Sequence, residues 1–210
     1  MSHSLLSDLL SRPWDAVELP QLALPAPADA LQRPASFSVF IVEGVSPAVV
    51  HTWLQHSGWV LAEQAPLKAP FAELVARTAH QKKLGRRRWE VLKATWPAAG
   101  CTVLLDPEMV IFTDEPKVGA LCAQHHTRAF AVLWERVSRT LVATQFNAQG
   151  VERQSMFVGG ALTRQRGGGF PNMHGEDPQE LFTVLRNAGL AVEELLGGAP
   201  EATVLLLLEG

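Results

Sequence analysis

The sequence predicts an α+β protein in which a mostly antiparallel sheet is packed with helices and is preceded by a Pro-rich extended N-terminal arm. Three observations support this prediction. Short apolar runs rich in Val, Leu, Ile and Phe alternate with turn signals between residues 101 and 158, which is typical of antiparallel strands. Segments with helical spacing and capping residues occur before, within and after this region. Apolar residues make up 47% of the 210-residue chain, which is enough to bury a full core.

Residues 1–36 predict an N-terminal helix followed by the arm. If residues 4–11 are helical, one face carries four leucines: Leu5, Leu6, Leu9 and Leu10. That face must dock on the body of the protein, on a partner or on a second copy of the chain. Five prolines follow between Arg12 and Pro34. Each proline removes a backbone donor and favours extended geometry in the residue before it, so this stretch predicts a semi-rigid arm.

The next part of the chain, residues 37–97, opens with a short strand–helix–strand unit. Ser46-Pro47 has the pattern of an N-cap followed by proline at the first helical position, and Gly58 is expected to end that helix. The predicted elements are a strand over 38–43, a helix over 47–55, a strand over 59–63, a helix over 71–83 and a strand over 89–96. Pro66 and Pro70 predict a loop before the second helix, and Pro97 is expected to end the last strand.

Residues 98–210 predict most of the sheet. The predicted elements are a hairpin of strands 101–105 and 109–112, a helix from 115 to about 125, and a meander of strands 130–134, 140–146 and 151–157. A last helix is expected with Asp177 as its cap and Pro178 at its first position, followed by a buried strand over 203–208. The glycine-rich stretch Gly159–Gly175 predicts a surface loop. Residues 37–210 are therefore expected to form a single domain, or alternatively a small lobe over 37–97 and a sheet over 98–210.

Composition limits the classes of function. The net charge of −3 and the pI near 6.2 provide no overall attraction for nucleic acid or an anionic membrane. Two cysteines in apolar surroundings, Cys101 and Cys122, predict buried free thiols of a reducing compartment. The first residues lack the pattern of a signal peptide, and the longest aliphatic run is too short to span a bilayer, so we expect a cytoplasmic protein that does not cross a membrane.

Two clusters of arginine are candidate binding sites. The first, Arg86, Arg87, Arg88 and Trp89, could grip phosphates beside an aromatic face or contact an acidic protein. The alternative for this cluster is a solvated turn. The second, Arg164 and Arg166, precedes three glycines whose backbone amides could help to hold an anion. Phosphate-binding loops lead directly from a strand into a helix, and this stretch does not, so a surface loop is the alternative here.

Chemistry of other kinds has weaker candidates. His174, Glu176 and Asp177 are suitable ligand types for a divalent cation, although their spacing matches no known motif and Asp177 is also a predicted helix cap. Ser46 lies where a nucleophile elbow would stand between strand and helix, but the second glycine of that motif is missing. The adjacent histidines His125 and His126 point in different directions on a helix and make a poor metal site. No cofactor is predicted.

The central segment has a recurring pattern of strand and turn residues: Phe130-x-Val132, then Ser138-x-Thr140, then Phe146-x-x-x-Gly150-x-x-Arg153. This pattern resembles uncharacterised bacterial domains, some of which are immunity proteins beside polymorphic toxins. The resemblance covers residues 104–153, with the helix near 177–189 and the apolar strand near the end. It implies a non-enzymatic protein that binds another protein, and it transfers no functional residue.

We therefore expect a cytosolic bacterial protein that binds a protein partner through its surface. An interface of that kind needs buried aromatic or Arg anchors, for which Trp134, Trp89 and Arg87 are candidates, unless the tryptophans belong to the core. Two alternatives stay open. One is a hydrolase or transferase that uses the loop over residues 164–177. The other is a homo-oligomeric structural protein that docks through its N-terminal arm.

Overall fold

The computed structural model describes residues 36–78, 81–84, 88–106 and 114–209. The predicted N-terminal helix and arm lie outside the described residues, and so do Arg86, Arg87 and the predicted strand 109–112. Within the described ranges, no helix is long and apolar enough to cross a membrane.

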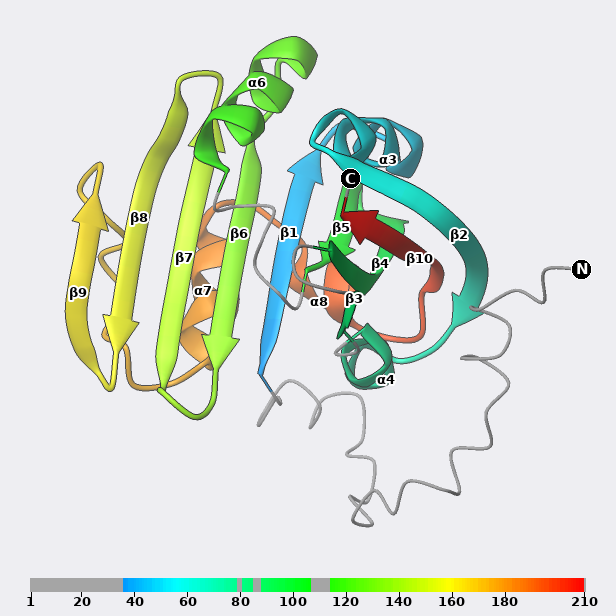
Figure 1. The fold of residues 1–210 in the computed structure, drawn as a ribbon. Coiled ribbons are helices and arrows are strands. Elements are labelled where there is room, and N and C mark those ends of the chain that lie inside the picture. Colours follow the sequence, from blue (N-terminus) through cyan, green and yellow to red (C-terminus); the bar gives the residue numbers. More distant parts are fainter. Residues whose placement is uncertain (1–35, 79–80, 85–87, 107–113, 210) are drawn as a thin grey trace, which may run out of the picture.

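The described residues form one antiparallel sheet of ten strands with five helices packed against it, which confirms the predicted fold class (Figure 1). The strand order is β2-β10-β4-β5-β1-β6-β7-β8-β9, and β3 pairs with β4. The strands are β1 (Phe37–Glu43), β2 (Trp59–Lys68), β3 (Gln81–Leu84), β4 (Arg88–Ala98), β5 (Cys101–Leu105), β6 (Ala129–Glu135), β7 (Thr140–Asn147), β8 (Gly150–Val158), β9 (Ala161–Arg166) and β10 (Glu201–Glu209). Strands β10 and β5 of the second part of the chain lie between strands β2, β4 and β1 of the first part, so the two parts share one sheet.

Strand β1 lies at the centre of the sheet. It pairs with β5 on one side, where Ile41 is opposite Val103, and with β6 on the other side, where Ile41 is opposite Phe130. Six of its seven residues are buried, Ser38 among them. A strand with both faces buried needs a layer of side chains above it and another below it.

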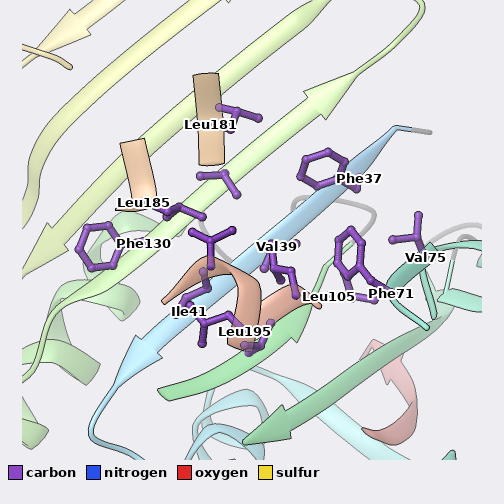
Figure 2. Close-up of a cluster of buried hydrophobic side chains, with 14 of the residues drawn as sticks. Phe37, Val39, Ile41, Phe71, Val75, Leu105, Phe130, Leu181, Leu185 and Leu195 are labelled. Atoms are coloured by element: carbon purple, nitrogen blue, oxygen red, sulfur yellow. The ribbon is translucent and has the colours of Figure 1, made fainter. Parts of the chain in front are cut away.

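The helices supply those two layers. Helices α3 (Pro47–His56) and α6 (Glu115–His125) cover one face, and helices α4 (Phe71–Thr78), α7 (Gln179–Asn187) and α8 (Val192–Leu196) cover the other. Figure 2 shows the second face, where Leu181 and Leu185 of α7 and Leu195 of α8 lie over side chains of β1. Alternate residues of each central strand point into the two cores, as the period of two in a strand requires.

One ion pair is buried within the sheet itself. Lys93 of β4 and Asp106, which follows β5, are directly opposite on the face covered by α3, and both side chains are 0% exposed. The Lys93 ammonium also lies 5.6 Å from the centre of the Trp59 ring. The next residue of β4 on the same face is Thr95, whose hydroxyl is 2.8 Å from Nε2 of His51 in α3. Polar side chains thus link β4, β5 and α3 inside this layer.

Most predicted elements of the sheet are confirmed. The meander corresponds to β6, β7 and β8, and the apolar strand near the end is β10, paired between β2 and β4. Both cysteines are buried free thiols, as predicted. Helix α6 ends at His125, and His126 follows in the left-handed conformation.

Several predicted boundaries were wrong. The stretch predicted as a surface loop contains strand β9, which lacks apolar alternation because its side chains are exposed. The helix predicted over 71–83 ends at Thr78, and residues 81–84 form β3. Strand β2 runs on through Pro66, which an edge strand tolerates. Strand β4 includes Pro97, which is possible because β10 pairs with β4 only as far as Thr95.

The start of α3 also differs from the prediction. Pro47 is at the first helical position, but the Ser46 side chain makes no capping hydrogen bond. Helix α8, which the sequence did not predict, follows α7 and places Leu195 and Leu196 in the core.

The buried ion pair leads to a prediction about stability. Replacing Asp106 with Asn removes the negative charge opposite Lys93 in the core, and we expect a loss of about 3–5 kcal/mol in the free energy of unfolding. The double substitution Lys93→Met/Asp106→Leu should recover most of that loss, because neither charge then has to be desolvated. Urea denaturation of the three proteins measures both effects, and equal losses in the single and double variants would contradict the expectation.

Candidate functional site

The structure brings the two predicted arginines of β9 together, but with a carboxylate between them. Nη1 of Arg166 lies 2.8 and 2.7 Å from the two carboxylate oxygens of Glu115, in the first turn of α6. Nη2 of Arg164 lies 3.7 Å from Oε1 of the same residue. All three side chains are partly exposed, so this triad contributes little to stability. Both arginines therefore lie on the α6 face of the sheet.

The glycines that follow β9 turn the chain toward the opposite face. Gly167 and Gly169 have φ of 57° and 63°, and a Cβ on Gly167 would lie 1.7 Å from the carbonyl oxygen of Glu152. The amide of Phe170 then donates a 2.9 Å hydrogen bond to Oγ of Ser155, on the α7 face of β8. The glycines serve this close approach of backbone to β8, and the two arginines and the loop after them end on different faces of the sheet.

The predicted metal ligands are arranged around a residue that the sequence analysis missed. The backbone amides of His174, Gly175, Glu176 and Asp177 all donate to the carboxylate of Glu180, over 2.5, 2.9, 3.0 and 3.1 Å. The Asp177 carboxylate accepts from the amide of Gln179 over 2.8 Å. Helix α7 begins at Gln179 with Pro178 at the N-cap position, so the predicted cap at Asp177 and helix start at Pro178 lie one residue too early. The spacing Asp177-x-x-Glu180 is that of a capping box, and from it the role of Glu180 could have been predicted. Among the described residues, no group of three or more His, Cys, Asp or Glu side chains could hold a metal ion.

Burial and hydrogen bonding act on Glu180 in opposite directions. Burial raises the pKa of its carboxyl, but the hydrogen bonds from the four amides together lower the pKa by more. The pKa of Glu180 therefore lies below its ordinary value. The ionised carboxylate is therefore the form that holds the loop over 174–177 against the start of α7.

A pocket of about 180 Å³ lies on the α7 face, where the sheet extends past the end of that helix. Its walls come from β7 and β8, from the loop after the glycines and from the C-terminal turn of α7. The lining residues are Gln145, Arg153, Phe170, Pro171, Asn172, Val184, Asn187 and Ala188. The predicted loop over 164–177 thus contributes Phe170, Pro171 and Asn172 to a pocket, while the arginines that suggested a site there do not reach it.

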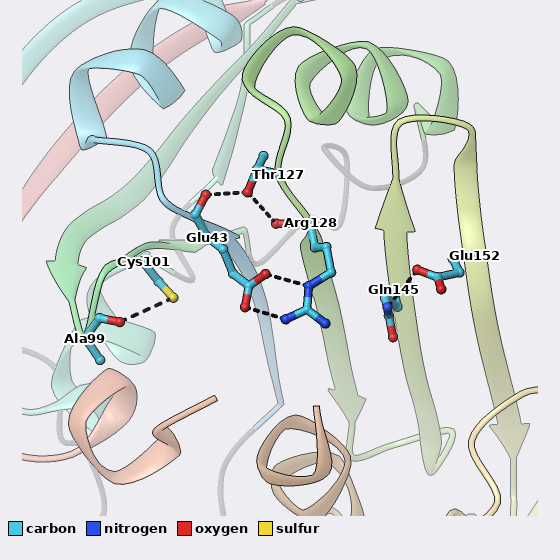
Figure 3. Close-up of polar contacts among 7 residues, drawn as sticks. All are labelled: Glu43, Ala99, Cys101, Thr127, Arg128, Gln145 and Glu152. Carbon is cyan, nitrogen blue, oxygen red and sulfur yellow. Dashed lines mark hydrogen bonds and ion pairs between the residues drawn. The ribbon is translucent and has the colours of Figure 1, made fainter. Parts of the chain in front are cut away.

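A row of polar side chains crosses the same end of the sheet (Figure 3). The guanidinium of Arg128 donates to both carboxylate oxygens of Glu43, over 2.7 and 2.9 Å, and the amide nitrogen of Gln145 donates to Glu152 over 2.7 Å. The hydrogen bonds to Glu43 raise the pKa of Arg128. Arg153 is opposite Gln145 on β8 and is exposed, and it forms no ion pair with any residue that the structure describes.

Cys101 stands beside this row, yet it is poorly suited to be a nucleophile. Burial raises the pKa of its thiol, with a further contribution from the Glu43 carboxylate. Its sulfur lies 3.8 Å from the carbonyl oxygen of Ala99. A thiol with a raised pKa is protonated at neutral pH, and the thiolate is the reactive form.

A second surface with unusual exposure lies at the edge of the sheet. We call β9 together with the β6–β7 turn (residues 136–139) the edge surface. The amide of Gly159, in the β8–β9 turn, donates to the carbonyl oxygens of Ser138 and Arg139, so the two turns lie side by side. Val137 is 93% exposed and Leu162 is 51% exposed, which is high for large apolar side chains.

Glu135 fixes the shape of the β6–β7 turn. Its carboxylate accepts from the Ser138 hydroxyl over 2.5 Å and from the amides of Ser138 and Val137 over 2.6 and 2.9 Å. These hydrogen bonds, of which the one from the Ser138 hydroxyl has the largest effect, lower the pKa of Glu135 to about 2. The turn therefore holds Val137 out in solvent in a defined position.

The other candidate binding residues that the structure describes lie in a strand or in the core. Arg88 and Trp89 are the first residues of β4, where that strand pairs with β3. Trp134 is 8% exposed and belongs to the core between the sheet and α7, so it cannot be a surface anchor.

The fold and these two regions define the chain as an α+β protein with an antiparallel sheet covered on both faces, a small pocket at one end and an exposed strand at one edge. Comparison with protein-family models, with curated proteins and with solved structures gave no match.

The capping arrangement predicts a pH-dependent contribution to stability. Replacing Glu180 with Ala should lower the free energy of unfolding at pH 7 by about 1–2 kcal/mol, the usual range for loss of a helix cap. Because the folded pKa of Glu180 is below its unfolded value, this contribution is complete above the unfolded pKa and is lost as the pH falls through the folded pKa. Urea denaturation between pH 7 and pH 3 measures the difference, with Glu176→Ala as the control, and a difference independent of pH would contradict it.

The β6–β7 turn gives a second prediction from electrostatics. In a ¹³C-detected NMR titration, Glu135 should have a pKa of about 2, and Ser138→Ala should move it toward the ordinary value of 4.5. The pKa of Glu180 should not change in that variant and is the internal control. An unchanged pKa of Glu135 would mean that the Ser138 hydroxyl does not stabilise the ionised carboxylate.

Proposed function

We propose that this chain is a non-enzymatic protein-binding domain of the immunity type, which holds an extended acidic segment of its partner against the edge surface. One observation carries the proposal. Strand β9 ends the sheet, and five of its six residues are exposed, with no further strand beside it among the described residues.

An exposed edge strand offers unpaired backbone donors and acceptors to another chain. A partner segment that adds a strand there gains main-chain hydrogen bonds, and its side chains meet those of the edge strand. Leu162 provides an apolar contact near the start of β9, and Val137 provides another at the neighbouring turn. Apolar side chains surrounded by polar ones are what a protein interface requires at its centre.

Charge favours an acidic partner and disfavours self-association. Arg164 and Arg166 lie along β9, and Arg136 and Arg139 lie in the adjacent turn without an ion pair to any described residue. The register between β8 and β9 is also broken by an irregularity beside Phe157. Positive charges and bulges on an edge discourage pairing of identical edges, whereas an acidic strand would be attracted.

The test is loss of partner capture on neutralising the edge. We expect the double variant Arg164→Gln/Arg166→Gln to bind the partner at least about tenfold more weakly, because two charge-assisted contacts are lost. The matched control is Arg186→Gln, which removes an exposed, ion-paired arginine from α7. Affinity purification with cross-linking from the native host identifies the partner, and calorimetry measures the three affinities.

Two results would contradict the proposal. One is the absence of any protein partner in the native host. The other is a partner whose affinity is the same for the double variant and for the wild-type protein, since the partner would then bind elsewhere. Circular dichroism of the double variant checks that its fold and melting temperature are retained.

A further inference from the structure

We propose that the pocket on the α7 face binds the C-terminal residue of a peptide chain, an apolar residue whose free carboxylate pairs with Arg153. This site is separate from the edge surface, whose arginines lie on the α6 face. The proposal therefore does not depend on the function proposed above.

The charge in the pocket carries the argument. Arg128 is already paired with Glu43 through two hydrogen bonds, and Arg164 and Arg166 share Glu115. Arg153 is the guanidinium that lines the pocket, and it makes no ion pair within the described part of the chain. A guanidinium favours planar carboxylates, which it can bind through two parallel hydrogen bonds. The side-chain amides of Asn172 and Asn187 provide further donors at the rim.

The size and lining of the pocket limit the body of the ligand. A volume of about 180 Å³ is close to that of a cavity of about 150 Å³ that accepts benzene, so one aliphatic or aromatic side chain fills it. Phe170, Pro171, Val184 and Ala188 provide apolar walls for such a side chain. An apolar cleft with a few converging polar groups is the usual form of a small binding site.

The side-chain carbonyl oxygen of Gln145 favours the C-terminal residue of a peptide over a simple carboxylic acid as the ligand. The amide nitrogen of Gln145 is used by Glu152, so its carbonyl oxygen points the other way (Figure 3). Gln145 and Arg153 are register partners on the neighbouring strands β7 and β8, and both line the pocket. An acceptor beside the guanidinium fits the backbone N–H of a terminal residue, next to the carboxylate that Arg153 binds.

The carboxyl end of α7 opposes this assignment only weakly. The end of a helix carries partial negative charge, which disfavours a nearby anion. The last carbonyl groups of α7, however, accept hydrogen bonds from the amides of Ala188, Gly189 and Leu190. A charge-assisted pair with Arg153 is the stronger effect.

The experiment is an NMR titration of the whole chain with three small probes. N-acetyl-leucine carries the carboxylate, the N–H and the apolar side chain, N-acetyl-leucinamide lacks the carboxylate, and 4-methylpentanoate lacks the N–H. We expect saturable shifts at Val184 and Ala188 with N-acetyl-leucine in the millimolar range. Each of the other probes should bind more weakly, the amide by at least about tenfold.

Variants separate the charge from the cavity. Arg153→Met keeps the aliphatic stem and should weaken N-acetyl-leucine by at least about tenfold. Arg139→Met, in the β6–β7 turn, is the matched control and should not change binding. Ala188→Leu should block the pocket while leaving Arg153 in place.

Several outcomes would overturn the proposal. The absence of saturable shifts, equal binding of the amide, or unchanged binding in Arg153→Met would each refute a carboxylate site at Arg153. Unchanged binding in Ala188→Leu would place the ligand outside this pocket. Equal binding of 4-methylpentanoate would refute the assignment to a chain terminus.

Discussion

The pairing of β1 on both of its edges is the constraint on which the rest of the structure depends. Its backbone groups lie in the middle of the sheet, where they are satisfied by β5 on one side and by β6 on the other. Its side chains alternate between two buried faces, so the fold is complete only when helices cover both. The strand also joins the part of the sheet made of β2, β10, β4 and β5 to the part made of β6–β9. Every other element is placed relative to it.

This constraint explains where the exposed features occur. On the β6 side of β1, helix α6 packs on β7 and β8, and α7 packs on β6 and β7. The sheet continues beyond the helices to β9, whose side chains face solvent. It also continues past the end of α7, where the pocket lies. Both candidate sites are therefore places where the sheet is larger than the helices that cover it.

Most of the charged side chains described above have a partner inside the protein, which limits their capacity to bind a ligand. The Lys93–Asp106 pair is fully buried between β4 and β5, and it favours one register of those strands over a shifted one. The Glu180 carboxylate accepts hydrogen bonds from the amides of residues 174–177, which follow the pocket-lining residues 170–172 in the chain. Arg128 and Arg166 each have a carboxylate partner. Arg153 differs from them because it lines a pocket and has no carboxylate partner among the described residues.

The sequence by itself determined the fold class, the β6–β8 meander, the strand near the C-terminus and, to within one residue, the start of α7, because apolar periodicity and helix-start residues are local signals. It did not determine β9, whose exposed side chains give no alternation, or the helix end at Thr78. Only the tertiary structure decided that Arg164 and Arg166 meet Glu115, that the glycine-rich loop reaches a pocket with Arg153, and that Trp134 is core. These contacts join residues distant in the chain across a sheet whose strand order no local pattern encodes.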